Sequence, residues 1–187
     1  SVAASMNYVY VAWDDDTFGN DEIFFKRSSD YGASWEATQR LTNNAGLSLY
    51  SSVAASSANV CVAWSDDTFG NAEIFFMFSN YYGESWAWQA TQRLSNNAGT
   101  SLCPSVTYSG DNIYVAWMDD TFDSNHEIFF KRGLDLGLSW QTTQRLTCNA
   151  GYSHLPSVAV SGINVYVAWE DDTFGNYEIF FKRGSVT

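Results

Sequence analysis

The chain has 187 residues, a formal net charge of −12 and an aromatic content of 17% (8 Trp, 11 Tyr and 13 Phe). Nucleic acids and anionic membrane surfaces are bound through basic patches, so this charge argues against both as partners. No apolar run approaches the roughly eighteen residues that a membrane-spanning helix needs.

Four copies of one sequence unit follow each other along the chain. The tripeptide Val11-Ala12-Trp13 recurs at 62–64, 115–117 and 167–169, and the four tryptophans are 51, 53 and 52 residues apart. A steady period of this length is typical of a repeat architecture. No linker or change of composition separates the copies, so we expect a single domain over residues 1–187. Its repeats span 1–46, 47–99, 100–151 and 152–187.

Each copy predicts the same series of short strands, which the fourth copy shows in chain order. A β-prone run at 156–160 leads through a turn at 161–164 into a run of β-branched and aromatic residues at 165–169. An acidic segment at 170–176 then separates this run from a third strand at 178–183. Copies one to three add a fourth strand, at 38–41, 91–94 and 143–146.

The predicted strands are apolar on both faces, as in Val9-Tyr10-Val11-Ala12-Trp13. A sheet with one wet face shows alternation instead, so both faces of each sheet must be covered. A β-sandwich with internal duplication is the alternative, but four strands per unit and a period near fifty favour a propeller. We therefore predict an all-β fold, a β-propeller of four four-stranded antiparallel blades. The last blade lacks its outer strand, and the ring closes alone or by dimerisation.

The turn after the third strand of copy one reads Ser28-Ser29-Asp30-Tyr31-Gly32-Ala33-Ser34-Trp35. It resembles the Asp-box, Ser-x-Asp-x-Gly-x-x-Trp, of sialidase-type (BNR-repeat) β-propellers. Copy two departs from the pattern with Tyr81 at the Asp position, and copy three with Gly133 at the Ser position. The candidate structural box residues are Ser28, Asp30, Gly32, Trp35, Ser79, Gly83, Trp86, Asp135, Gly137 and Trp140.

The resemblance implies a structural role for these boxes, because in the family they lie on the face away from the active site. A short Asp side chain can accept hydrogen bonds from its own turn, and Gly permits a positive φ. The arginine triad, Tyr–Glu pair and Asp acid of sialidases find no matching residues here, so we assign no catalytic residue. Arg40, Arg93 and Arg145 repeat on the predicted fourth strand, apart from the acidic loops.

Sixteen of the twenty-one carboxylates, Asp123 among them, fall in the loops between second and third strands. These loops share one face of a propeller, so we expect an acidic face and a basic one. Three interpretations stay open: turn chemistry, Ca²⁺ binding by carboxylates, and binding of a neutral carbohydrate beside aromatic platforms. The candidate platforms are Phe18, Phe69, Phe122, Phe174 and Tyr152. The candidate ligand-binding residues are Asp15, Asp16, Glu22, Asp66, Asp67, Glu73, Asp119, Asp120, Glu127, Asp171, Asp172 and Glu178.

Departures from the repeat are where a specialised function would be expected. His126 ends the third acidic loop, and Cys148 and His154 lie in the segment entering copy four, on the same predicted face. Cys and His can bind Zn²⁺ or Cu²⁺, and drift of the repeat is the alternative. Cys61, Cys103 and Cys148 occupy unrelated positions and predict free thiols rather than a disulfide framework, with a Cys103–Cys148 pair left open. Trp88, inserted after Trp86, predicts an apolar contact surface on the second blade.

These patterns together favour a non-catalytic ligand-binding or scaffold propeller, extracellular or on the cell surface, with neutral glycan and Ca²⁺ as candidate ligands. The alternative is a glycoside hydrolase that uses two facing carboxylates. Residues 179–181 would form an outer edge with unpaired backbone groups. This edge predicts either a homodimer through this strand or a chain that is a fragment of a longer propeller.

Overall fold

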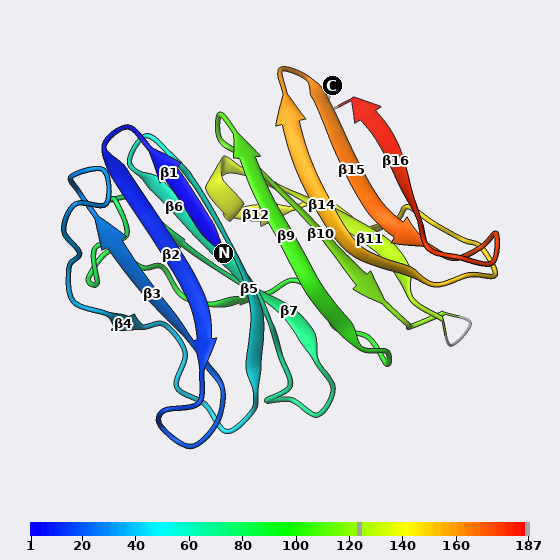
Figure 1. Ribbon diagram of the computed structural model, residues 1–187, viewed down its shortest axis with the longest axis horizontal. Coiled ribbons are helices and arrows are strands. Elements are labelled where there is room, and N and C mark those ends of the chain that lie inside the picture. The colour runs from blue at the N-terminus through cyan, green and yellow to red at the C-terminus, as the bar shows by residue number, and fades with distance from the viewer. Residues whose placement is uncertain (123–124, 186–187) are drawn as a thin grey trace.

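The computed structural model describes residues 1–122 and 125–185. It contains four antiparallel sheets in chain order, here called blades A to D (Figure 1). Blade A consists of β1 (Val2–Ser5), β2 (Tyr8–Asp15), β3 (Glu22–Ser28) and β4 (Gln39–Arg40). Blade B consists of β5 (Ser48–Ser56), β6 (Asn59–Asp66), β7 (Glu73–Ser79) and β8 (Gln92–Arg93). Blade C consists of β9 (Ser101–Ser109), β10 (Asn112–Asp119), β11 (Glu127–Leu134), the 3₁₀ turn η1 (Asp135–Gly137), β12 (Ser139–Trp140) and β13 (Gln144–Arg145). Blade D consists of β14 (Ser153–Ser161), β15 (Asn164–Asp171) and β16 (Glu178–Ser185).

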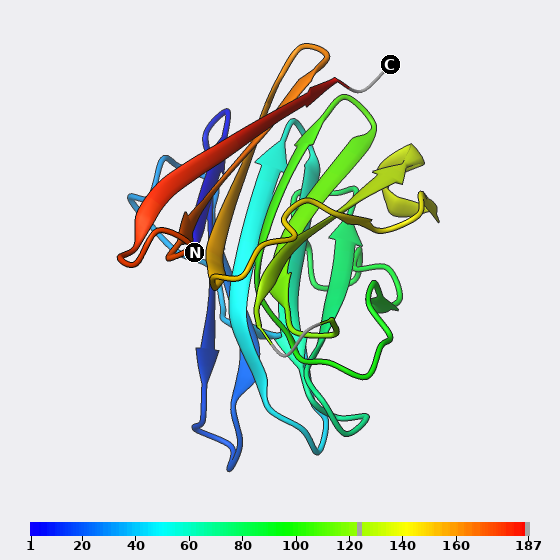
Figure 2. The same ribbon diagram turned by 90° about the vertical axis from the view of Figure 1, so that its right-hand side faces the viewer.

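The predicted β-propeller is confirmed by this arrangement. Each sheet is an antiparallel meander, in which β12 and β13 of blade C both pair with β11, and blade D has three strands among the described residues. Figure 1 shows the sheets side by side, with blade A at one end and blade D at the other, and Figure 2 shows the row turned by 90°. The fourth strands are only two residues long and thus shorter than predicted. Their hydrogen bonding does not stop there, because the N–H of Leu41 still donates to Ile23 at 2.8 Å.

Alternation along the strands gives every blade two packing faces. The forward face carries the first and third apolar residues of the third strand, Ile23 and Phe25 in blade A, and it packs against the next blade. The rear face carries Val60, Val62 and Trp64 in blade B and receives the forward face of the preceding blade. Burial of side chains of this size contributes about 1.5–3 kcal/mol each. Covering on both faces explains why the strand sequences show no polar alternation.

The same packing recurs at the other two junctions. Ile74 and Phe76 of blade B lie in one core with Trp117 of blade C. Ile128 and Phe130 of blade C lie in another core, with residues of blade D. The innermost strands are also linked, because Val53, Val106 and Val158 donate their N–H groups to Ser1, Ser52 and Ser105 of the preceding blade at 3.1, 3.1 and 3.0 Å. Each blade is thus fixed to its neighbour by apolar packing and by a backbone contact.

The three cysteines are free thiols in the structure, as predicted. Cys61 is fully buried, Cys103 is half-buried and Cys148 is exposed. Among the described residues no helix is long and apolar enough to cross a membrane.

Candidate ligand-binding face and blade junctions

The predicted loop carboxylates form two layers rather than one surface. The inner layer is buried and consists of Glu22, Glu73, Glu127, Asp66, Asp119 and Asp171. The outer layer is exposed or half-buried and consists of Asp15, Asp16, Asp67, Asp120, Asp172 and Glu178. Asp123 lies outside the described residues. The inner layer occupies the junctions between blades, where its side chains are at most 3% exposed.

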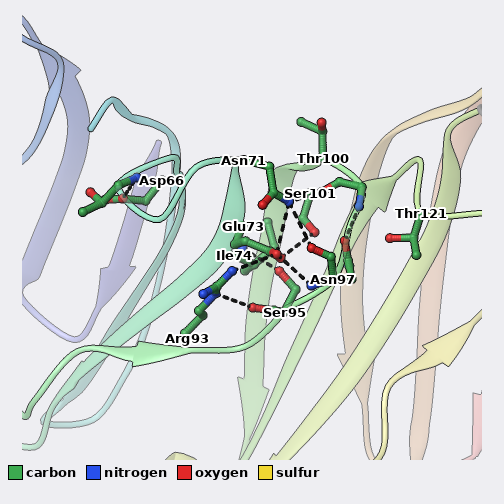
Figure 3. Close-up of polar contacts among 12 residues, drawn as sticks. Asp66, Asn71, Glu73, Ile74, Arg93, Ser95, Asn97, Thr100, Ser101 and Thr121 are labelled. Atoms are coloured by element: carbon green, nitrogen blue, oxygen red, sulfur yellow. Dashed lines mark hydrogen bonds and ion pairs between the residues drawn. The ribbon is translucent and has the colours of Figure 1, made fainter. Parts of the chain in front are cut away.

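The junction between blades B and C shows what the inner layer does (Figure 3). Glu73 accepts hydrogen bonds from the Arg93 guanidinium at 2.9 Å and from the backbone N–H of Asn97 at 2.8 Å. The Asn97 amide then donates to Asp119 of the next blade at 2.7 Å. The hydroxyl of Ser101 donates to the same carboxylate at 2.7 Å. We call these five side chains the junction network.

The junction network repeats at the other two junctions. Between blades A and B, Arg40 pairs with Glu22 at 2.8 Å, and Asn44 donates to Asp66 at 2.7 Å. Between blades C and D, the corresponding distances are 3.0 Å for Arg145 and Glu127 and 2.8 Å for Asn149 and Asp171. The buried carboxylates therefore join successive blades.

The tripeptide Asn-Ala-Gly is a part of the junction network that sequence reasoning missed. It occurs at 44–46, 97–99 and 149–151, directly before each inner strand. A Cβ at Gly99 would lie 2.4 Å from the backbone nitrogen of Thr121, so only glycine permits this close approach. The Asn97 amide oxygen meanwhile accepts the N–H of Gly99 at 2.9 Å. The threefold recurrence of Asn-Ala-Gly at one position of the repeat was the sequence signal from which this part of the network could have been predicted.

The expectation of one acidic and one basic face was wrong for the fourth-strand arginines. Arg40, predicted to lie apart from the acidic loops, pairs with the fully buried Glu22. The cause is strand register: Arg40 lies opposite Phe24 in the β3–β4 ladder, which brings it close to the first residue of β3. Arg93 and Arg145 follow the same rule.

Hydrogen bonding lowers the pKa of two of the buried aspartates, Asp66 and Asp171. Burial raises the pKa of Asp171, but donors on Thr173, Ser153 and Asn149 outweigh it and hold this pKa at about 2. The pKa of Asp66 is likewise lowered, because hydrogen bonds from Thr68, Ser48 and Asn44 exceed the effect of burial. A general acid must be protonated near the operating pH, so these two carboxyl groups are unsuited to that role.

Some carboxylates of the outer layer accept hydrogen bonds as well. Asp67, Asp120 and Asp172 each accept a backbone N–H across the junction, at 2.6, 2.5 and 2.6 Å. Asp15, in the first blade, accepts from the N–H of Thr17 at 2.8 Å. The Asp15 contact is turn chemistry, one of the three interpretations of the loops, whereas the other three contacts join successive blades. Asp16 and Glu178 are exposed.

The predicted aromatic platforms fold back onto their own blades. Phe18, Phe69 and Phe122 stack on the third-strand phenylalanines Phe24, Phe75 and Phe129, with centroids 6.0–6.1 Å apart. A fourth-strand arginine lies over each, at 5.0, 5.4 and 5.2 Å from the ring centroid. Phe174 stacks on Phe180 in the same way. These four phenylalanine rings nevertheless stay 50–78% exposed. Tyr152, the fifth predicted platform, is 44% exposed and lies beside His154, with ring centroids 5.7 Å apart.

A groove runs beside two of these rings. Between blades B and C it has a volume of about 710 Å³ and is lined by Asn96, Thr121, Phe122, Thr143 and Arg145, among others. Between blades A and B a groove of about 350 Å³ is lined by the corresponding residues Asn43, Thr68, Phe69 and Thr91. Each groove combines an exposed aromatic ring with amide and hydroxyl groups, and a preceding blade forms its other wall.

The box turn of blade A has the hydrogen bonds expected from its sequence. Asp30 accepts from the hydroxyl and the N–H of Ser34 at 2.6 and 2.8 Å, and from the Ser28 hydroxyl at 2.7 Å. The hydrogen bonds from Ser34 and Ser28 lower the pKa of Asp30 to about 2. Gly32 has a φ of +89°. Asp30 thus organises its own turn.

Trp88, and not Trp86, takes the place in blade B that Trp140 takes in blade C. Trp88 donates to Gln39 of the preceding blade at 2.9 Å, just as Trp140 in blade C donates to Gln92 at 2.7 Å. Trp86 is 71% exposed. The two-residue insertion in copy two moves the packing ring two positions along the chain, which a fixed motif spacing does not detect.

The described residues contain no group of three or more His, Cys, Asp or Glu side chains placed to hold a metal ion. His126 and His154 do meet, with His126 Nδ1 2.9 Å from His154 Nε2. Cys148 is exposed and is not part of this pair.

The four antiparallel sheets and their junctions define the class of protein as a β-propeller, and solved structures of similar fold include glycoside hydrolases. A Hadza microbial sialidase matches with a TM-score of 0.77 and 12% identity, over 100% of this chain and 44% of that one. A Trypanosoma rangeli sialidase in complex with sialic acid matches with a TM-score of 0.69 and 14% identity, over 98% and 35%. A Penicillium chrysogenum α-L-arabinanase in complex with arabinobiose matches with a TM-score of 0.66 and 13% identity, over 95% and 59%.

These likenesses concern the fold, because all three identities are low. The chain spans between about a third and three fifths of the length of these structures. No protein-family model and no curated protein matches the sequence.

Proposed function

We propose that the protein is a non-catalytic glycan-binding propeller that holds neutral sugars in the grooves between successive blades. The observation that carries the proposal is the repeated groove, in which an exposed ring faces amide and hydroxyl groups. An aromatic ring covers the C–H face of a sugar, while amide and hydroxyl groups exchange hydrogen bonds with its hydroxyls. Concave sites of this composition are typical of small-ligand binding.

Two further observations support binding over catalysis. Hydrolysis of a glycoside needs one protonated and one ionised carboxyl group flanking the bond. The inner carboxylates accept hydrogen bonds from Arg, Asn and Ser donors, and these contacts keep them buried and occupied. Asp66 and Asp119, engaged in this way, form part of the walls of the two grooves, which recur at two successive junctions. Recurring weak sites raise the apparent affinity for a branched or repeated glycan.

A glycan array, with the 187-residue chain probed in Ca²⁺ and in EDTA, tests the proposal. We expect neutral glycans to bind, and the comparison of the two buffers decides whether Ca²⁺ takes part. The affinity for the best glycan is then measured by calorimetry for Phe69→Ala, Phe122→Ala and the double variant. Each single change should lower it about fivefold to tenfold, and the double change should lower it further.

Phe18→Ala is the matched control. Phe18 has the same stacking on Phe24 and the same arginine above it, but no preceding blade forms a groove beside it in the described part of the chain. We expect its affinity to equal that of the wild type. Equal binding by the double variant would contradict the groove assignment, and no binding to any glycan would leave a scaffold role. Turnover of an aryl glycoside that is lost in Asp16→Asn or Glu178→Gln would establish the hydrolase instead.

A further inference from the structure

A basic pocket of about 370 Å³ lies between blades C and D. Its lining includes the side chains Arg132, Arg145, Lys182 and Arg183 and, within the described part of the chain, no Asp or Glu. Arg145 is paired with Glu127, whereas the other three form no ion pair with any described residue. A chain with a net charge of −12 thus has a local excess of positive charge at this place.

The corresponding pocket between blades A and B contains carboxylates. The same stretch of the repeat lines it, residues 39–41 in place of 144–146, but Glu36 and Glu84 line it as well. The Nε of Arg27 donates to Glu36 at 2.8 Å, and its Nη2 donates to Glu84 at 2.5 Å. Two carboxylates, one from each blade, therefore accept hydrogen bonds from the guanidinium at this junction.

Arg132 is the counterpart of Arg27, since both are the sixth residue of the third strand of their blade. Gln141 takes the place of Glu36, because each donates its N–H to the carbonyl of its arginine, at 2.8 and 3.0 Å. The Nε of Arg132 is buried and has no hydrogen-bond partner among the described residues. A buried donor without an acceptor is unfavourable, so this position of blade C lacks the acceptor that blade A supplies.

Contacts within the protein hold the two nearest cations in place. The Nη2 of Arg132 donates to Asn112 at 3.3 Å, and the guanidinium lies over the ring of Tyr114, 6.0 Å from its centroid. Lys182, on the blade D side of the pocket, donates to the carbonyl of Leu146 at 3.1 Å. An ammonium group has three N–H donors, so this contact leaves two of them for a ligand. Each blade thus contributes one positioned cation.

We propose that this pocket binds a small oxyanion, the carboxylate, sulfate or phosphate group of a ligand, in the place that the Glu36 carboxylate has beside Arg27. Arg132 donates to the anion from Nε, and Lys182 adds a second charged donor. A polyanion is disfavoured, because the rest of the chain is strongly negative and would repel it. Arg132 and Lys182 line neither groove, so the site is independent of the proposed glycan binding.

The NMR signal of the Arg132 Nε–H tests this site, because it reports directly on the donor that lacks a partner. The 187-residue chain is titrated with sodium acetate, sulfate and phosphate in turn, and with sodium chloride at equal ionic strength. We expect a saturable shift with at least one oxyanion and none with chloride, and the tightest oxyanion identifies the group. The Nε–H of Arg27 is the internal control and should not move, because Glu36 holds it. No saturable shift with any oxyanion, or an equal shift with chloride, would overturn the proposal.

Gln141→Glu is the matched variant, because it gives blade C the carboxylate that blade A has at this position. The new carboxylate should pair with Arg132, shift the Nε–H signal without any added anion, and weaken oxyanion binding about tenfold or more. The variant should unfold at the wild-type temperature or above it, which separates this loss from damage to the fold. Lys182→Met, which copies Met77 of blade B, should weaken binding about threefold. Unchanged oxyanion affinity in Gln141→Glu would overturn the proposal.

Discussion

The three internal junctions and the two end faces contain the same residue types in different surroundings. Ile128 and Phe130, on the forward face of blade C, are 0% and 8% exposed, whereas Ile179 and Phe181 on that face of blade D are 74% and 70% exposed. At the other end, the rear face of blade A is half-buried where that of blade B is buried. Burial is therefore a property of a junction and not of a blade.

The polar groups show the same contrast. Glu127 is fully buried and paired with Arg145, but Glu178, at the same position of blade D, is exposed and accepts from the neighbouring Asn176 side chain at 2.6 Å. Asp66 accepts from Asn44 and Ser48 of the junction, whereas Asp15 accepts from Thr17 of its own blade. Each blade thus carries one half of a junction network on each face.

The largest contrast is expected for apolar truncation. Phe76→Ala should lower the free energy of unfolding by about 4 kcal/mol, because it leaves a cavity beside Trp140 in the core between blades B and C. Phe181→Ala removes the same ring from an exposed position and should cost less than about 0.5 kcal/mol. Urea unfolding measures both, and equal losses would mean that the forward face of blade D is covered in solution.

Loss of the Glu73–Arg93 ion pair should give the next largest decrease in the free energy of unfolding. Glu73→Ala leaves Arg93 and the N–H of Asn97 without their buried acceptor, which should cost about 3 kcal/mol. Glu178→Ala, the exposed counterpart, should stay within about 0.5 kcal/mol of the wild type in the same urea titration. A small loss in Glu73→Ala would show that solvent enters the junction.

The close approach between the backbones of Gly99 and Thr121 is tested by replacing the glycine with alanine. Gly99→Ala places a methyl group 2.4 Å from the Thr121 nitrogen, so blades B and C must separate locally, at a cost of about 2 kcal/mol. Gly184→Ala, in β16, meets no atom within 4 Å and should leave the unfolding temperature unchanged. Thermal melts of the two variants make the comparison, which fails if both melt together.

Acid should weaken the junction between blades C and D in a defined pH range. The folded-state pKa of Asp171 is about 2, below its ordinary value of 3.8. A lowered folded-state pKa stabilises the protein above the ordinary value, and this stabilisation is lost as the pH falls towards 2. The difference in unfolding free energy between wild type and Asp171→Asn should therefore be greatest near neutral pH and shrink below pH 4. Asp16→Asn, exposed on blade A, should follow the wild-type curve at every pH.

Self-association is expected to change the mass of the particle more than its stability. In blade C the outer edge of β11 is paired, because Ile128 accepts the N–H of Leu146 at 2.7 Å, while β16 is the outer strand of blade D in the described structure. We propose that two copies pair through this edge, so the wild type should sediment as a dimer. Phe181→Pro removes an outward N–H and should give a monomer, whereas Phe181→Ala keeps it and should remain dimeric. A monomeric wild type contradicts the proposal.

The fold could be predicted because its signals are local and repeat four times. Strand chemistry in segments such as 165–169 and the spacing of the tryptophans are properties of short stretches of chain. The junction network could not be predicted in this way, because Glu73 and Asp119 meet only through Asn97 of a loop between them. Such contacts depend on the conformation of the loop, which the sequence does not reveal. The charges of these residues by themselves suggested an open acidic surface. The packing role of Trp88 was missed for a related reason. The turn holds two extra residues, so the ring that packs against the preceding blade comes two positions later in the sequence but keeps its place in space.

The reactivity of the Cys61 thiol reports on the opening of one junction. Its thiol is fully buried in the core between blades B and C, and burial raises its pKa to about 12. Alkylation requires a thiolate that the reagent can reach, so Cys61 reacts only in those moments when the two blades part. Cys148 is exposed and reacts at once, so it is an internal reference for the reaction rate on the same chain. The difference between the alkylation rates of Cys61 and Cys148 therefore reports how often the interface between blades B and C opens.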